Sequence, residues 1–162
     1  MATSVKLNKK IISLQQAVFD LDSVYKVAKS SLEGEGYTFF EKEQGMKTDQ
    51  YGQQISFEFQ GDKKFDEFCK VKITITCKFK NIEKIKVDNK TLQSGICELV
   101  IVPVAEVDYQ NKWGRDKFGE FLFGIYTKFL KKKELDDKYF DVVDAEVMSI
   151  YEQIKDALNL YK

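Results

Sequence analysis

The segment that decides the fold is FCKVKITITCKFK, which runs from Phe68 to Lys80. Apolar and polar residues alternate along it, so an extended chain sends them to opposite faces. This alternation, with β-branched residues on both faces, predicts a β-strand that is dry on one side and wet on the other. Such a strand requires a sheet with one covered face. The predicted dry face consists of Cys69, Val71, Ile73, Ile75, Cys77 and Phe79.

The composition indicates one globular domain over residues 1–162, of which we expect the polar and basic residues 1–9 to be flexible. Apolar residues make up 43% of the chain and charged residues 32%, a balance typical of folded rather than disordered proteins. The 26 basic and 26 acidic side chains cancel. The overall charge therefore gives no reason to expect nucleic acid or anionic lipid as a partner.

The sequence predicts a cytoplasmic protein without a transmembrane segment. The longest uncharged apolar run, residues 99–105, is too short to cross a bilayer, and the first ten residues lack the apolar core of a signal peptide. Three widely spaced cysteines do not resemble a disulfide framework. Histidine, the commonest general base and metal ligand near neutral pH, is missing from the chain.

The N-terminal third predicts an edge strand followed by a helix. Residues 10–19 have a mixed pattern in which Ile12, Leu14 and Val18 can share one face, with a break at Gln16, and we interpret them as an edge strand. Apolar residues then recur at helical spacing over residues 21–33. Asp20 or Asp22 can cap the start of this helix, and Gly34 or Gly36 can end it.

The middle of the chain predicts an antiparallel run of strands joined by polar turns. Turn residues are expected at 45–52, at 61–64 and at 88–90. The segment 96–107 is the most apolar one, so we expect both its faces to be covered for part of its length, with Pro103 at an edge or a bulge. The predicted strands are 37–44, 54–60, 68–80, 82–87 and 96–107.

Two helices are predicted at the C-terminal end. An aromatic stripe at helical spacing covers residues 118–130, and a second stripe runs from Val143 to Tyr161 behind Asp141 and Asp144. The expected fold class is therefore α+β. It consists of two layers, a curved antiparallel sheet of about five to six strands packed against one N-terminal and two C-terminal helices.

This order of elements resembles the helix-grip arrangement of START-like lipid-transfer domains. In that family a long C-terminal helix closes a cavity over an antiparallel sheet, so the resemblance implies a carrier or sensor of a hydrophobic small molecule. The stretches Asp20-Leu21-Asp22, Gly36-Tyr37 and 40–43 (FEKE) are also similar to small archaeal α+β proteins of unknown function. That second resemblance implies no activity.

No catalytic, metal or cofactor site can be assembled from the sequence. The cysteines are in phase with apolar neighbours and are expected to pack in the core, and their spacing has no zinc pattern. The glycines of Gly114–Gly119 have P-loop spacing, but Glu120 and Phe121 stand where a lysine and a hydroxyl are needed. Carboxylates are plentiful, and a catalytic pair among them stays an open alternative to caps and solvated turns.

Two surfaces are candidates for binding. Lys70, Lys72, Lys78 and Lys80 lie on the polar face of the central strand, where they can either contact phosphates or simply remain solvated. Trp113 and Arg115 belong to residue types enriched at interface hot spots, although the tryptophan can equally close over the core.

The resulting hypothesis is a non-enzymatic binding module without a cofactor, most simply a protein-interaction domain. The first alternative is the START-like carrier, and a more distant one is a surface for nucleic acid or phosphate formed by the lysines. In the carrier, the aromatic helix would line the cavity through Phe118, Phe121, Leu122, Ile125, Tyr126 and Phe129.

Overall fold

The computed structural model describes residues 3–50, 52–66, 68–107 and 139–159. The described chain forms six strands and two helices, with strands predominating. In chain order the elements are β1 (Thr3–Lys6), β2 (Lys10–Phe19), α1 (Leu21–Gly34), β3 (Thr38–Asp49), β4 (Gly52–Lys64), β5 (Cys69–Val87), β6 (Lys90–Val107) and α4 (Asp141–Asn159).

The strands form one open antiparallel sheet in which β6 has the most partners. The order is β1, β6, β5, β4, β3, and β2 also pairs with β6. On one side β6 pairs with β5 from Cys69↔Val107 to Val87↔Lys90. On its other side β2 covers the first part and β1 the last part. The two N-terminal strands thus share one edge of the sheet, and β3 forms the other edge.

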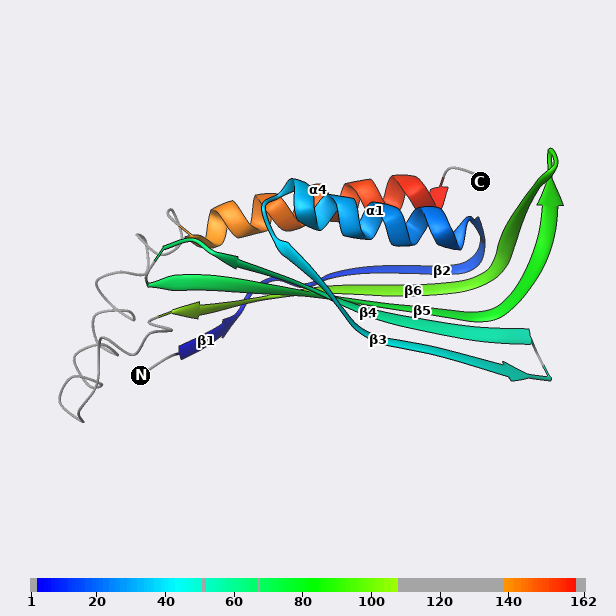
Figure 1. Cartoon of the computed structure of the whole chain (residues 1–162), viewed down its shortest axis with the longest axis horizontal. Coiled ribbons are helices and arrows are strands. Elements are labelled where there is room, and N and C mark those ends of the chain that lie inside the picture. Colours follow the sequence, from blue (N-terminus) through cyan, green and yellow to red (C-terminus); the bar gives the residue numbers. More distant parts are fainter. Residues whose placement is uncertain (1–2, 51, 67, 108–138, 160–162) are drawn as a thin grey trace.

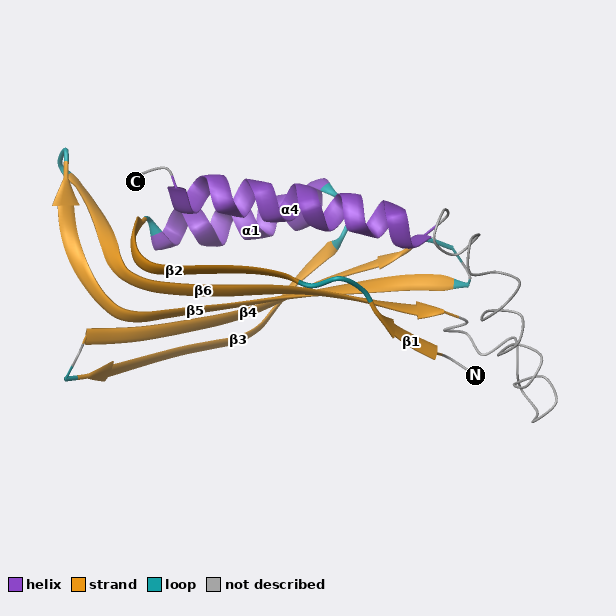
Figure 2. Cartoon of the chain, turned by 180° about the vertical axis from the view of Figure 1, so that it is seen from behind, coloured by secondary structure: helices purple, strands orange, loops and turns teal. Residues whose placement is uncertain are grey.

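Both described helices lie over the same face of this twisted sheet, side by side (Figures 1 and 2). We call the face under the helices the inner face and the opposite one the outer face. The predicted dry side of β5 lies on the inner face. Its six residues, which are every second residue from Cys69 to Phe79, are each at most 1% exposed. The buried side of α4 closes the core from above through Val143, Val147, Ile150, Ile154 and Leu158.

Helix α1 begins and ends as its sequence predicts. Asp20 is the N-cap, where one carboxylate oxygen accepts from the Asp22 backbone N–H at 3.2 Å and the other accepts from the Ser23 hydroxyl at 3.0 Å. The helix ends at Gly34, and Gly36 follows with a φ of +88°, a conformation that glycine adopts without strain. The predicted helix over residues 21–33 is confirmed within one residue.

The β5–β6 hairpin bends toward the helices near one end of the sheet (Figure 1). At this level β2 and β5 each contain one extra residue relative to their neighbours, in β2 between Leu14 and Ala17 and in β5 between Phe79 and Glu83. Bulges of this kind increase local twist and bend a strand. The hairpin then closes through Asp88 and Asn89, whose φ values of 49° and 64° confirm the predicted tight turn.

The predicted turns at 45–52 and 61–64 are wrong, because both stretches belong mainly to strands. Strand β3 continues to Asp49 on a ladder with β4 in which Met46 lies opposite Ile55, so its polar residues are solvated strand positions. Gly61 lies inside β4, where an added Cβ would come within 2.9 Å of the Leu32 side chain. The glycine therefore permits close packing of the sheet beneath α1 and makes no turn.

The chain also departs from prediction at its start and in its helices. Residues 3–6, expected to be flexible, form β1 against β6. Two helices are described where three were predicted, and the predicted aromatic helix at 118–130 lies outside the described residues. The helix layer extends over only part of the long sheet (Figures 1 and 2).

Strand β6 was expected to be covered on both faces for part of its length, with Pro103 at an edge or a bulge. No described helix covers its outer face, although burial on both sides was expected. Pro103 lies opposite Ile73 in the interior of the sheet, where its carbonyl oxygen accepts from the Leu7 N–H at 3.0 Å. Since N and C=O of a strand residue point to the same side, the missing N–H faces the gap between β1 and β2.

Candidate functional site: the outer face of the sheet

The outer face has an apolar centre and a charged border. Cross-strand register places Val100, Val102 and Val104 of β6 beside Thr76, Thr74 and Lys72 of β5, and all three valines are half-buried. Ile11 of β2 lies opposite Val100 on the same face and is 53% exposed. These four apolar residues, Ile11, Val100, Val102 and Val104, are called the valine patch below.

Ion pairs border this patch at both ends. Lys70 lies 3.5 Å from Glu106 at one end, and Lys80 lies 3.8 Å from Glu98 at the other, in both cases measured from the ammonium to a carboxylate oxygen. All four side chains are between 34% and 45% exposed, so each pair contributes about 0–1 kcal/mol. The main effect of these ion pairs is to place charged groups at both ends of the valine patch.

The four lysines predicted to share a face do so, and acidic residues lie beside them. Lys72 pairs in register with Asp62 of β4, and Lys78 with Glu98 of β6. Neither Lys72 nor Lys78 forms an ion pair with another described residue, and both are exposed. The lysine row is therefore interleaved with carboxylates, and it does not form a continuous basic surface of the kind that follows a phosphate backbone.

The other predicted site residues lie outside the described residues. These are the loop pair Trp113 and Arg115 and the six candidate cavity residues Phe118, Phe121, Leu122, Ile125, Tyr126 and Phe129.

Aromatic side chains fill much of the space between α1 and the sheet. Phe59, fully buried, lies with its ring centroid 5.2 Å from Tyr25 and 5.4 Å from Phe39. The rings of Phe19 and Phe79 are 4.9 Å apart. These separations are those of aromatic pairs in direct contact. In this part of the interior the phenylalanines pack on one another.

The cysteines are buried as predicted, and burial suppresses their reactivity. It raises the pKa of Cys69, with the Asp66 carboxylate adding to the effect, to about 12. Burial followed by the Glu98 charge raises the pKa of Cys97 to about 12 as well. Cys77 is completely buried, and its pKa is also raised by burial. Because the thiolate is the reactive form, these are packing residues.

A buried polar cluster that the sequence did not predict joins α4 to the sheet. The Lys63 ammonium lies 2.5 Å from one Glu146 carboxylate oxygen, and the Tyr37 hydroxyl donates to the other at 3.3 Å. Lys63 also donates to the Glu35 carbonyl oxygen at 2.8 Å. Burial and the Glu146 carboxylate raise the pKa of Tyr37, so its hydroxyl remains a donor. With each group paired, the cluster acts as a polar fastening between elements.

A second polar contact closes the same end of the molecule. The Tyr139 hydroxyl donates to one Asp66 carboxylate oxygen at 2.5 Å, while the other oxygen accepts from the backbone N–H groups of Phe68 and Cys69. Asp66 therefore shapes the β4–β5 turn and holds the residues that precede α4. Both polar contacts are satisfied within the protein, which favours a structural role for them.

Neither a metal centre among the described residues nor a known relative indicates a further site. Among the described residues, no three His, Cys, Asp or Glu side chains gather so that they could hold a metal ion. Neither described helix is long and apolar enough to span a membrane. No known protein family matches the sequence, and no curated protein is significantly similar to it.

Proposed function

We propose that the protein is a non-enzymatic binding module that docks another protein on the outer face of its sheet. The observation that carries the proposal is the valine patch, an apolar centre bordered by charged residues on a face that no described helix covers. An apolar core with a polar rim is the usual anatomy of a protein–protein interface.

The charges on the face indicate the chemistry of the partner. Lys70 and Lys80 are engaged with Glu106 and Glu98, whereas Lys72 and Lys78 form no ion pair with another described residue. Rim charges of this kind direct association with a surface of opposite sign. The partner we propose therefore presents its own apolar patch bordered by carboxylates.

The two alternatives have less support from the described residues. A START-like carrier needs an apolar cavity between helix and sheet, and the ring contacts of Tyr25, Phe39 and Phe59 occupy part of that space. A phosphate-binding surface needs a continuous row of positive charge, and carboxylates such as Asp62 and Glu98 interrupt the row of lysines.

Site-specific photocrosslinking in the native cells tests the proposal. A benzophenone amino acid replaces Val102 in one variant and Glu152, an exposed residue of α4, in a matched control. We expect a discrete heavier adduct from the first variant, identifiable by mass spectrometry, and none from the second. Changing Lys72 and Lys78 to glutamine should reduce the yield, because it weakens attraction to an acidic rim. In an extract of the same cells, raised salt should reduce the yield for the same reason.

The proposal is wrong if the adduct pattern does not depend on the position of the probe. It is equally wrong if the probe at position 102 reacts only within its own chain, with no product heavier than the protein itself.

A further inference from the structure

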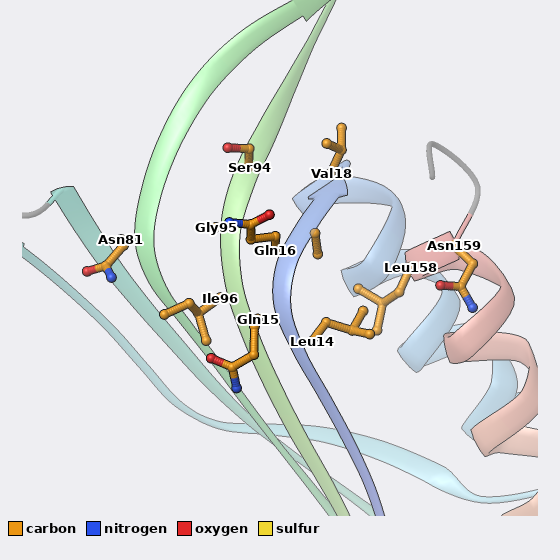
Figure 3. Close-up of a pocket in the computed structure, with 11 residues that line it drawn as sticks. Leu14, Gln15, Gln16, Val18, Asn81, Ser94, Gly95, Ile96, Leu158 and Asn159 are labelled. Atoms are coloured by element: carbon orange, nitrogen blue, oxygen red, sulfur yellow. The ribbon is translucent and has the colours of Figure 1, made fainter.

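A groove of about 710 Å³ lies where the sheet bends. Its lining is more polar than the valine patch, and an inference about it does not depend on the proposed function. Figure 3 shows its lining residues gathered around the bulged part of β2, with the end of α4 on one side of that strand and β6 and β5 on the other. The volume falls within the range of about 300–1,000 Å³ for small-molecule sites. Its lining is Leu14, Gln15, Gln16, Ala17, Val18, Asn81, Ser94, Gly95, Ile96, Leu158 and Asn159.

The backbone irregularities of the sheet create this groove. On β2 the register shifts between Leu14 and Ala17, so that Gln15 and Gln16 lie outside the regular ladder. On β5 the shift includes Asn81, which has a φ of 54°, a left-handed conformation that asparagine tolerates. Bulges commonly redirect side chains in this way.

Gly95 lets β6 pass tightly between the two bulges. A Cβ at this position would lie 2.7 Å from the Lys80 carbonyl oxygen and 3.1 Å from that of Asn81, both of them backbone atoms. Only glycine therefore fits without moving the neighbouring strand. Strand β6 is therefore closely packed against β5 where it lines the groove.

The groove is uncharged in a chain that is rich in charge. Charged residues are 32% of the sequence, so about three or four would be expected by composition among eleven residues, yet none of the described lining residues is charged. Four lining residues carry carboxamides, each with one acceptor oxygen and two N–H donors. Within the described chain these amides, Gln15, Gln16, Asn81 and Asn159, form no side-chain hydrogen bond.

The remaining lining supplies apolar contact beside these polar groups. Leu14, Ile96 and the buried Leu158 offer aliphatic surface, and the Ser94 hydroxyl can both donate and accept. A phosphate or a carboxylate would find no cation among the described lining residues, and leaving water without one is costly for an anion. The groove suits a neutral ligand that has many hydroxyl groups and also aliphatic C–H surface.

We infer that this groove binds a neutral saccharide through the carboxamides of Gln15, Gln16 and Asn81, which lie on the same side of β2 (Figure 3). Paired hydroxyls of a sugar ring can accept from an amide N–H and donate to an amide oxygen at the same time, while the C–H face of the ring contacts Ile96, which lies on the same side of β2 as these amides. This activity would exist alongside protein docking and does not require it.

Nuclear magnetic resonance titration of the whole chain tests the inference. The probes are maltose, cellobiose, lactose and chitobiose, with glucuronate and uridine as comparison ligands. For at least one disaccharide we expect saturable shifts of the side-chain amide signals of Gln15, Gln16 and Asn81. The signals of Gln44 and Gln53, which belong to β3 and β4, should stay in place.

Two variants separate the groove from a general effect on the protein. Replacing the exposed Gln15 and Gln16 together with alanine should weaken binding by about tenfold or more, because both supply direct hydrogen bonds. The control Gln153→Ala removes an exposed amide of α4 outside the groove and should leave the affinity unchanged. The inference is overturned if no disaccharide gives saturable shifts, if glucuronate or uridine binds more tightly, or if both variants behave alike.

Discussion

Replacement of Lys63 by methionine should show that burial, rather than distance alone, determines the strength of an ion pair in this protein. The Glu146 side chain is 7% exposed and that of Lys63 is 25% exposed, and their charged atoms are 2.5 Å apart. Methionine preserves most of the side-chain volume but removes the charge. It leaves the Glu146 carboxylate inside the protein with only the Tyr37 hydroxyl as a described partner.

We expect Lys63→Met to lower the free energy of unfolding by about 3 kcal/mol. Breaking a buried pair by removing one partner typically costs about 3–5 kcal/mol, and the partial exposure of Lys63 places this case at the lower end. The double variant Lys63→Met with Glu146→Leu should recover most of the loss, because no unpaired charge then remains buried. Urea denaturation at pH 7, followed by circular dichroism, measures all the variants.

The matched control is Lys26→Met on α1. Lys26 lies 2.8 Å from Asp22, but the two side chains are 71% and 70% exposed, so the loss should be no more than about 0.5 kcal/mol. If Lys63→Met costs no more than Lys26→Met, the cluster does not fasten α4 to the sheet. The same conclusion follows if the double variant is no more stable than the single one.

Three further predictions concern the bend, the helix cap and the thiols. Gly95→Ala should destabilise by about 1–3 kcal/mol because its Cβ would collide with the Lys80 carbonyl oxygen, whereas Gly34→Ala, with nothing within 4 Å, should stabilise by up to about 1 kcal/mol in the same urea assay. Asp20→Ala should cost about 1 kcal/mol at pH 7. Burial alone would raise the pKa of Asp20, but hydrogen bonds from Ser23 and Lys90 outweigh it and lower that pKa, so the stability it adds is complete above about pH 4 and is lost on acidification. A thiol reagent at pH 8 should label less than one cysteine per native chain and all three in urea, because burial raises the pKa of each thiol.

Each of these predictions has an outcome that would contradict it. Equal stability of the two glycine variants would mean that β6 can move away from β5 at the bend. If the loss of unfolding free energy in Asp20→Ala is as large in acid as at pH 7, the ionised carboxylate of Asp20 does not stabilise the helix cap. Rapid labelling of the native protein would show that the sheet opens readily.

Local alternation predicted the centre of this fold because it depends on the strand alone. The apolar residues of β5 from Val71 to Ile75 lie in the core, and the lysines between them lie on the outer face. The predicted strand 10–19 coincides with β2, and the break in its pattern at Gln16 falls in the bulge. In both cases the signal and the structure occur in the same few residues.

The strand ends were harder to predict because neighbouring strands decide them. The polar residues that follow Gln44 remain in β3 because β4 completes their backbone hydrogen bonds. The local sequence of β3 does not indicate which strand will pair with it. Gly61 has the residue type of a turn, yet its place beneath Leu32 depends on a helix that comes much earlier in the chain.

The same reasoning explains what the sequence showed of the candidate site. The spacing of Glu98, Val100, Val102, Val104 and Glu106 puts them on one face, so the arrangement of the valine patch was present in the pattern. Whether a helix covers that face is a tertiary property that the local pattern does not contain. Cover on both faces was expected for part of this strand, and in the described chain the outer valines are half-buried with no described helix over them. The pairing of Lys63 with Glu146 joins residues 83 positions apart, and no local pattern links them.

The position of β6 between the first and the middle strands has a consequence for how the chain reaches its native state. Lys10 lies opposite Ile101, and Thr3 lies opposite Val107. Both N-terminal strands must therefore wait, unpaired along their whole length, until the last strand of the sheet has been made. Contacts between such distant segments slow folding, since a long loop must close before they form. A nascent or truncated chain that ends before Lys90 has its first two strands without their partner and β5 with an open edge, which is the condition in which sheets associate with other chains.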